Sequence, residues 1–350
     1  MKLIPNINGL RALLAFIVVI FHIPQFCKNR GFPFFNNLAI FQKGNEAVYM
    51  FFSLSGFLII RQLYLEKSTT NSINLLFFFR RRILRIFPLY YLVLTFGFLY
   101  YRLILPYMGF NYENNYDLIN GIILSFTFFP NIFATYSPGG IIEVLWSIGI
   151  EEQFYLLIAH LIFIIPFKKI NSFLLLFTIL YFVLYFSESV KFINDYNMLF
   201  FYFSFSGFCA IITLEKSIKF YNFRYLIIIV FVFYFTTSIF KNNMTDLFYH
   251  LLSMILFGLT LCSFAEKPIK LLENKPMIYL GKISYGVYMY HAIMMQFIGF
   301  IYLKSNLYLK ISNLSSILIF NLLVFISTVL LAHLSFKYFE SYFLKLKYKY

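Results

Sequence analysis

The sequence predicts an all-α fold, a polytopic membrane bundle of about ten transmembrane helices with both termini in the cytoplasm. Of its 350 residues, 61% are hydrophobic and only 12% are charged, and a soluble domain of this size cannot bury so much apolar surface. Apolar runs long enough to cross a bilayer recur along the whole chain. We therefore expect one integral membrane domain over residues 1–350, without an additional soluble domain.

Ten apolar segments have spanning length, about 20 residues each. They are predicted at residues 9–27, 46–65, 86–105, 145–166, 172–190, 197–214, 223–240, 246–265, 283–303 and 315–335. An eleventh candidate, residues 118–133, is interrupted by Pro130 and followed by the turn-forming sequence "SPGG". The distribution of basic residues in the loops indicates whether this segment crosses the membrane.

The chain carries 29 basic and 14 acidic residues, a net charge of +15, which here reflects cytoplasmic loops rather than a nucleic-acid partner. If 118–133 does not cross the membrane and the N-terminus is cytoplasmic, nearly all basic clusters lie on the cytoplasmic side. These clusters lie at 61–85, 168–169, 215–224, 266–282 and 345–350. If it does cross, the four lysines between Ala265 and Ile283 move outside, against the positive-inside rule. We expect 118–133 to be re-entrant or interfacial.

The first span carries two ionisable residues, Arg11 near its inner end and His22 in its outer half. The eleven steps from Arg11 to His22 make about 1100°, close to three full turns, so both side chains share one helix face about 16 Å apart. Ionisable groups inside a membrane normally face the bundle interior and mark a site. A neutral imidazole can take a proton from a hydroxyl, so His22 is a candidate general base. The alternative is a histidine hydrogen-bonded between helices.

The fourth span begins with "LWSIGIEEQFYLL", which places Glu151 in the outer half of the membrane, at the depth of His22. A carboxylate there is expected to hold the second imidazole nitrogen and to stabilise the imidazolium. Ser147 and Tyr155 lie one turn on either side of Glu151. Trp146 either belongs to this site or is an interfacial aromatic anchor.

The cytoplasmic rim of the third span holds the arginine-rich stretch "RRRILRIFP", residues 80–88. Arg81, Arg82 and Arg85 are reachable from one side, and guanidinium groups suit bidentate phosphate binding. The alternative is a positive-inside anchor touching anionic lipid. Arg11 lies at the same rim and either joins this cluster or snorkels to the surface.

In the ninth span, Ser284 and His291 are seven residues apart and share a helix face, roughly with Tyr288. This polar stripe lines a channel or belongs to a packed helix interface. The three cysteines stand apart in apolar surroundings, so neither a disulfide framework nor a metal site is indicated. HExxH, CxxC, P-loop and GxSxG patterns are absent, which leaves metal hydrolysis, redox chemistry and ATP hydrolysis without sequence support.

Six motifs in this order resemble the acyltransferase 3 family of integral-membrane O-acyltransferases, which act on bacterial surface polysaccharides and related acceptors. The motifs are "NGLRALLAFIVVIFH", "VYMFFSLSGFLI", "RRRILRIFPLYYL", "LWSIGIEEQFYLL", "LGKISYGVYMYHA" and "LSFKYFESYF". The resemblance covers essentially the whole chain. It implies ten transmembrane helices in a bacterial cytoplasmic membrane, acyl-CoA taken from the cytoplasm, and a hydroxyl acylated on the outer side.

The resemblance also implies roles for particular residues. The expected catalytic residues are His22 and Glu151. The expected donor-binding residues are Arg11, Arg81, Arg82, Arg85, Ser284, Tyr285 and His291, and the expected acceptor-binding residues are Trp146 and Ser147. No permanently bound cofactor is expected, because acetyl-CoA is a substrate. The expected partners are membrane lipid, a carbohydrate acceptor and glycan-assembly proteins.

The sequence therefore predicts transfer of an acyl group, most simply acetyl, from acyl-CoA to a sugar hydroxyl. A direct transfer and an acyl-enzyme intermediate are both compatible with the residues. The rival prediction is a transporter or flippase for a lipid-linked sugar, because a polar path through ten helices also serves that function. No repeated half supports the rival. A purely structural scaffold leaves the intramembrane His22 and Glu151 unexplained.

Overall fold

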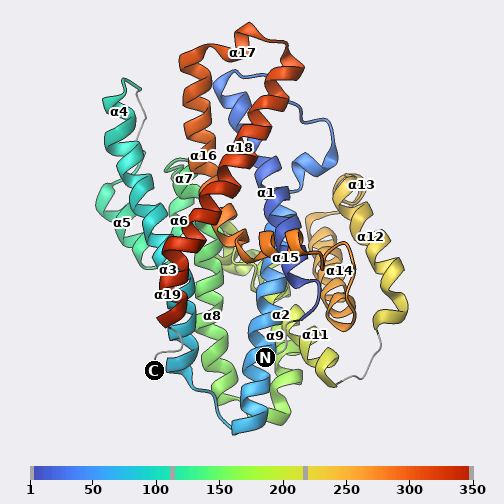
Figure 1. Cartoon of the computed structure of the whole chain (residues 1–350). Helices are drawn as coiled ribbons and strands as arrows, with labels where there is room; N and C mark the ends of the chain where they lie inside the picture. Colours follow the sequence, from blue (N-terminus) through green and yellow to red (C-terminus); the bar gives the residue numbers. More distant parts are fainter. Residues whose placement is uncertain (1–3, 111–114, 216–219, 347–350) are drawn as a thin grey trace.

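The computed structural model describes residues 4–110, 115–215 and 220–346, and this part of the chain is helical without a β-strand (Figure 1). Residues 216–219 and 347–350, which carry part of two predicted basic clusters, lie outside the described residues. Ten helices of this part have 13 or more residues. They are α1 (Ile7–Arg30), α2 (Gly44–Thr70), α3 (Leu75–Leu99), α8 (Trp146–Ile164), α9 (Ile170–Phe186), α11 (Phe200–Glu215), α12 (Arg224–Thr236), α14 (Asp246–Glu266), α16 (Ser284–Ser305) and α18 (Asn313–Ser335).

Shorter helices connect these elements. The α-helices are α4 (Leu105–Tyr107), α5 (Leu118–Phe126), α6 (Pro130–Ala134), α7 (Gly140–Glu143), α10 (Lys191–Asp195), α13 (Ile239–Asn243), α15 (Lys275–Lys282), α17 (Leu307–Lys310) and α19 (Ser341–Lys345). Four 3₁₀ turns occupy Ala39–Gln42, Phe167–Lys169, Glu188–Val190 and Phe220–Phe223, and π-helical turns occupy Tyr100–Ile104 and Phe336–Glu340.

The ten long helices coincide with the ten predicted apolar segments. Eight helices of the described chain are long and apolar enough to cross a membrane, and the pair α11 and α12 adds a ninth when it is taken as one broken span. The prediction of a polytopic helix bundle is confirmed. In Figure 1 the turn between α2 and α3 lies at one end of the bundle and α17 lies at the other.

Close helix packing in the bundle depends on the small residues of α2. A Cβ atom on Gly56 would lie 2.1 Å from the carbonyl oxygen of Phe203 on α11, so only glycine permits this approach. The Ser206 hydroxyl of α11 donates to the Ser53 carbonyl of α2 at 2.6 Å. The small residues of "FFSLSGFLI" in α2 therefore form part of the contact between α2 and α11.

The segment 118–133 does not form a spanning helix. It folds as α5 and α6, and α5 has nine residues, about 14 Å of helix, which is half of a hydrocarbon core. The carbonyls at the end of α5 are not left bare, because Tyr90 donates to Ser125 at 2.7 Å and Tyr91 donates to Phe126 at 3.1 Å. These contacts agree with the prediction of a re-entrant or interfacial segment.

Candidate active site

A small polar pocket, here called the inner pocket, lies between α1, α2, α3, α8 and α16. Its volume is about 90 Å³. Its polar lining residues are Arg11, Ser55, Arg82, Arg85, Ser147, Glu151, Tyr155, Ser284, Tyr285 and Tyr288. Seven of the residues selected from the sequence therefore meet in one place, although they come from four helices.

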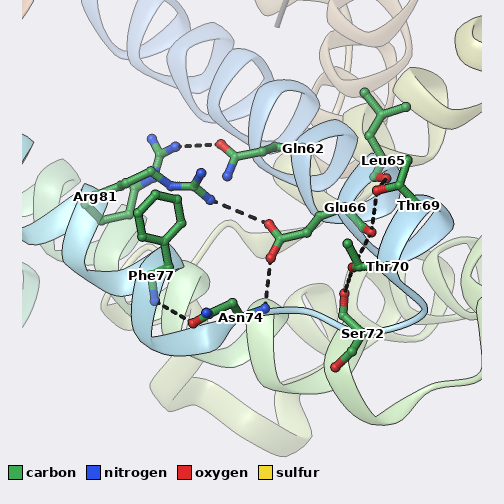
Figure 2. A network of polar contacts seen from close by, with 10 residues as sticks. Gln62, Leu65, Glu66, Thr69, Thr70, Ser72, Asn74, Phe77 and Arg81 are labelled. Carbon is green, nitrogen blue, oxygen red and sulfur yellow. Dashed lines mark hydrogen bonds and ion pairs between the residues drawn. The ribbon is translucent and has the colours of Figure 1, made fainter. Parts of the chain in front are cut away.

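Figure 2 shows the contacts around the turn between α2 and α3, which hold Arg81 beside Glu66. Asn74 caps α3 by accepting from the Phe77 N–H at 2.9 Å, and its own N–H donates to Glu66 at 2.8 Å. The second Glu66 oxygen lies 3.6 Å from Arg81 Nη2, and the Arg81 guanidinium lies 4.3 Å from the centre of the Phe77 ring. Arg81 does not line the pocket, so the structure separates it from the two arginines with which the sequence grouped it.

Arg82 is held in the inner pocket by a different residue of α2. Its Nη2 donates to Gln62 Oε1 at 3.1 Å. Arg82 Nε, Gln62 Nε2 and Arg11 Nε are buried and have no hydrogen-bond partner within the described chain. Buried N–H donors without partners are costly, and a phosphate or carboxylate is the ligand that guanidinium groups satisfy best. The unpartnered donors of Arg11 and Arg82 therefore suit an anionic ligand.

Glu151 belongs to the inner pocket and is not paired with His22. Its Oε1 accepts from the Ser55 hydroxyl at 3.0 Å and its Oε2 accepts from the Tyr155 hydroxyl at 2.8 Å. Within the described chain no hydrogen bond joins Glu151 to His22, so the predicted histidine–carboxylate pair is wrong. The physical reason is the position of Glu151 along the bundle: it lines the inner pocket together with Arg11 of α1, whereas His22, eleven positions further along α1, does not line that pocket.

Tyr288 of α16 closes the outer end of the inner pocket. Its hydroxyl donates to the Val144 carbonyl at 2.8 Å. The same hydroxyl lies 2.8 Å from Ser147 Oγ, and since a phenol has one proton, Ser147 donates to Tyr288. Ser147 and Tyr288 thus link α8 and α16 across the bundle. We call this contact the partition.

His291 lies directly behind the partition and contacts His22. Its side chain is fully buried, and its Nδ1 lies 2.5 Å from the Tyr288 carbonyl oxygen, so Nδ1 carries the proton. Its Nε2 is then a bare acceptor, and it has no partner within the described chain. The His22 and His291 rings have centroids 5.2 Å apart. The neighbour of His22 is a second histidine, which the sequence had placed with the donor-binding residues.

A second and much larger cavity, here called the outer cavity, opens on the other side of the partition. Its volume is about 650 Å³. Its polar and aromatic lining residues are His22, Gln25, Phe26, Asn29, Arg30, Asn45, Tyr49, Tyr101, Asn131, Thr135, Ser137, Glu143, Trp146, Asn197 and Gln296. Sequence reasoning found His22 and Trp146 but missed the other residues, which lie in loops and near helix ends. The sequence does contain a pattern that could have identified these residues, because several Asn and Gln residues of the cavity lie toward the same end of the predicted spans.

The outer end of α2 is fixed beside this cavity by a buried ion pair. Lys43 Nζ lies 3.8 Å from Glu46 Oε1 and donates to the Tyr249 hydroxyl at 2.9 Å. Tyr249 in turn donates to Glu46 at 2.8 Å. Burial lowers the pKa of Lys43, and the Glu46 carboxylate partly opposes this shift. The cluster holds the first turn of α2, from which Asn45 and Tyr49 reach the cavity.

The chain is similar in sequence to proteins that are named as acetyltransferases. It is 25% identical over 273 residues to a putative acetyltransferase of Acidianus two-tailed virus, a match that covers 75% of this chain and 76% of the viral protein. It is 29% identical over 165 residues to the peptidoglycan O-acetyltransferase OatA of Listeria monocytogenes and 31% identical over 166 residues to the O-acetyltransferase OatA of Staphylococcus aureus. Each OatA match covers 45% of this chain and 24% of the relative. No solved structure matches the chain significantly.

A family model adds a match over most of the chain. The model, described as an acyltransferase domain, matches residues 4–334 and therefore includes both cavities and the partition between them. The resemblance inferred from the six motifs is confirmed: the chain is a multi-pass membrane protein that belongs to the acyltransferase 3 family.

Proposed function

We propose that this protein is an O-acetyltransferase of the bacterial cytoplasmic membrane. In this proposal it moves an acetyl group from cytoplasmic acetyl-CoA to a hydroxyl of a glycan on the outer side. The names of the relatives support acetyl transfer, and OatA of Listeria monocytogenes is named for transfer to peptidoglycan. The observation that carries the proposal is the arrangement of an arginine-lined inner pocket and a polar outer cavity on two sides of one partition.

The proposed topology has ten spans with both termini cytoplasmic. Ten long helices occur at the predicted positions, and residues 118–133 form two short helices instead of an eleventh span. With this count the start of α3, which carries Arg82 and Arg85, lies at the cytoplasmic side. The outer cavity then lies on the opposite side, because the end of α1 and the beginning of α2 line it.

The arginines of the inner pocket bind the donor in this proposal. Arg82 and Arg85, with Arg11, hold the phosphates of acetyl-CoA through charge-assisted hydrogen bonds. Ser284 and Tyr285 line the same pocket and contact the donor. The pantetheine arm, roughly 15 to 20 Å when extended, carries the thioester past the partition toward His22. Arg81 is left out of this role because Glu66 engages it.

His22 acts as the general base for the acceptor hydroxyl. It takes the hydroxyl proton while the acceptor oxygen bonds to the acetyl carbon, the carbon–sulfur bond breaks, and the proton passes to the departing CoA thiolate. His291 takes the place that the sequence had assigned to Glu151, because its bare Nε2 accepts a hydrogen bond from the His22 imidazolium. Glu151 instead balances the arginine charges of the inner pocket. Trp146 and other residues of the outer cavity bind the acceptor.

The test is label transfer by the purified full chain in lipid vesicles, with radiolabelled acetyl-CoA and a panel of glycans. Transfer to a glycan that is lost in His22→Ala is the expected result. The rival function predicts a different outcome, in which a labelled lipid-linked sugar crosses the bilayer without CoA. That outcome, together with no acetyl transfer to any glycan, would overturn the proposal.

A further inference from the structure

Arg30 is the cation of the outer cavity, and it has no carboxylate partner. It lies at the end of α1, where its Nη2 donates to Gln296 Oε1 at 2.7 Å. The ion pairs of the described chain are Lys43–Glu46, Lys241–Glu46 and Arg81–Glu66, so none involves Arg30. A guanidinium group has five N–H donors, and a single amide oxygen satisfies only one of them. Arg30 is half-buried, so its remaining donors are open to water or to an anionic ligand in the cavity.

The cavity itself supplies no such anion. Glu143 is the one carboxylate among its described lining residues, and Glu143 Oε1 accepts from the Gly139 N–H at 3.2 Å. The other polar groups are mostly amides and hydroxyls, which bind neutral sugar hydroxyls as donors or as acceptors. Gln296, the partner of Arg30, also lines the cavity, so the bonded end of the Arg30 guanidinium lies at the cavity wall.

We propose that Arg30 forms an anion subsite in the outer cavity, and that the acceptor glycan carries a carboxylate or phosphate group at a fixed distance from the hydroxyl that is acetylated. This inference rests on the proposed function in so far as it names the ligand an acceptor. It adds the chemical class of that acceptor, an anionic glycan.

The geometry of α1 gives the distance between the anionic group and the hydroxyl that is acetylated. Arg30 follows His22 by eight residues of one continuous helix, which is about 12 Å along the axis. A linked sugar ring spans roughly 5 Å at bond lengths of about 1.5 Å. The anionic group therefore lies roughly two sugar units from the acetylated hydroxyl, and a cavity of about 650 Å³ has room for such a chain.

The sequence offers a direct probe of binding that does not depend on turnover. Trp146 is the single tryptophan of the chain, and it lines the outer cavity. Tryptophan fluorescence of the full chain in lipid therefore reports occupancy of this cavity. The titrants are a neutral oligosaccharide, the same oligosaccharide oxidised to one uronate, and the same oligosaccharide with one phosphate.

We expect the wild type to bind the uronate or the phosphate form about ten- to hundredfold more tightly than the neutral form, the range of a charge-assisted hydrogen bond. Comparison of the two charged forms identifies the anion. In Arg30→Gln this preference should be lost, with a much smaller change for the neutral form. Arg30→Lys, which keeps the charge but not the planar fork, should retain part of it.

Lys28→Gln is the matched control, because Lys28 is an exposed cation in the same last turn of α1 and does not line the cavity. It should leave the preference unchanged. Equal wild-type affinity for neutral and charged forms would overturn the inference, as would an equal loss of both in Arg30→Gln, which indicates a packing role. Acetyl transfer is measured in parallel, so anion-selective binding without transfer would contradict the proposed function and leave the subsite standing.

Discussion

The inner pocket and the outer cavity differ in size, in charge and in the residues that line them. The inner pocket has a volume of about 90 Å³ and is lined by Arg11, Arg82 and Arg85. The outer cavity has a volume of about 650 Å³, and its described lining carries one arginine among many amide side chains. Concentrated positive charge suits a polyphosphate donor, whereas amides and aromatic rings suit a bulky, hydroxyl-rich acceptor. The difference supports the proposal that two chemically unlike substrates approach from opposite sides.

The largest effect should come from His22, the proposed base, which lines the outer cavity. His22→Ala removes the base, so acetyl transfer should fall by about 100- to 10,000-fold, the usual contribution of general-base catalysis. Donor binding should be nearly unchanged, because the arginines are intact. Steady-state transfer rates and equilibrium binding of acetyl-CoA measure the two quantities. A parallel loss of donor affinity would mean that His22 belongs to the donor site.

The second prediction tests the charge of the inner pocket. Arg82→Gln should raise the donor KM by about ten- to hundredfold, because a charge-assisted contact to phosphate is lost. The effect should disappear with acetyl-pantetheine, a donor without the nucleotide phosphates. Arg81→Gln is the matched control, since its guanidinium is 3.6 Å from Glu66 and does not line the pocket. Equal effects of the two variants would contradict the separation of these arginines.

A smaller effect is expected at Gln62, which orients Arg82 by accepting its Nη2 at 3.1 Å. Gln62→Leu should raise the donor KM by about tenfold with little change in kcat. Gln62→Glu should be worse than Leu, because a carboxylate would pair with Arg82 and neutralise its charge. A packing role predicts the reverse order, since Glu has nearly the shape of Gln. Donor KM for the two variants decides between these roles.

The smallest effect is expected at the partition. Tyr288→Phe removes the hydroxyl that donates to Val144 and accepts from Ser147. Because a bond of this kind contributes about 1 kcal/mol, or about a fivefold factor, kcat should fall by about fivefold and donor binding should be retained. The ratio of acetyl transfer to acetyl-CoA hydrolysis should also fall, because a wider opening at the partition would admit water from the outer cavity to the path along which the thioester passes. An unchanged ratio would mean that Tyr288 is not a barrier.

The sequence predicted the fold better than the site. Hydrophobic length placed all ten long helices, and Pro130 with the loop charges identified 118–133 as a non-spanning segment. Helical periodicity grouped Ser284 with His291 and roughly with Tyr288. Ser284 and Tyr288 line the inner pocket, whereas His291 does not. These properties depend on local sequence and on the bilayer, so they require no knowledge of which helices are neighbours.

The partners of the site residues could not be predicted in this way. Depth along the membrane suggested Glu151 as the partner of His22, but α2 supplies a partner of Glu151 and α16 places His291 beside His22. Arg81 and Arg82 are adjacent in sequence, yet they have different partners. Arg81 pairs with Glu66, and Arg82 donates to Gln62. Such pairings follow from tertiary packing, which periodicity does not encode.

The most direct test of the central claim is a sidedness experiment on sealed vesicles that contain the protein. Radiolabelled acetyl-CoA is enclosed in the vesicles, and an anionic or neutral glycan that cannot cross the bilayer is supplied outside. Two opposed substrate cavities predict that intact vesicles acetylate the external glycan. Transfer only after the vesicles are permeabilised, when both substrates share one side, would contradict the account.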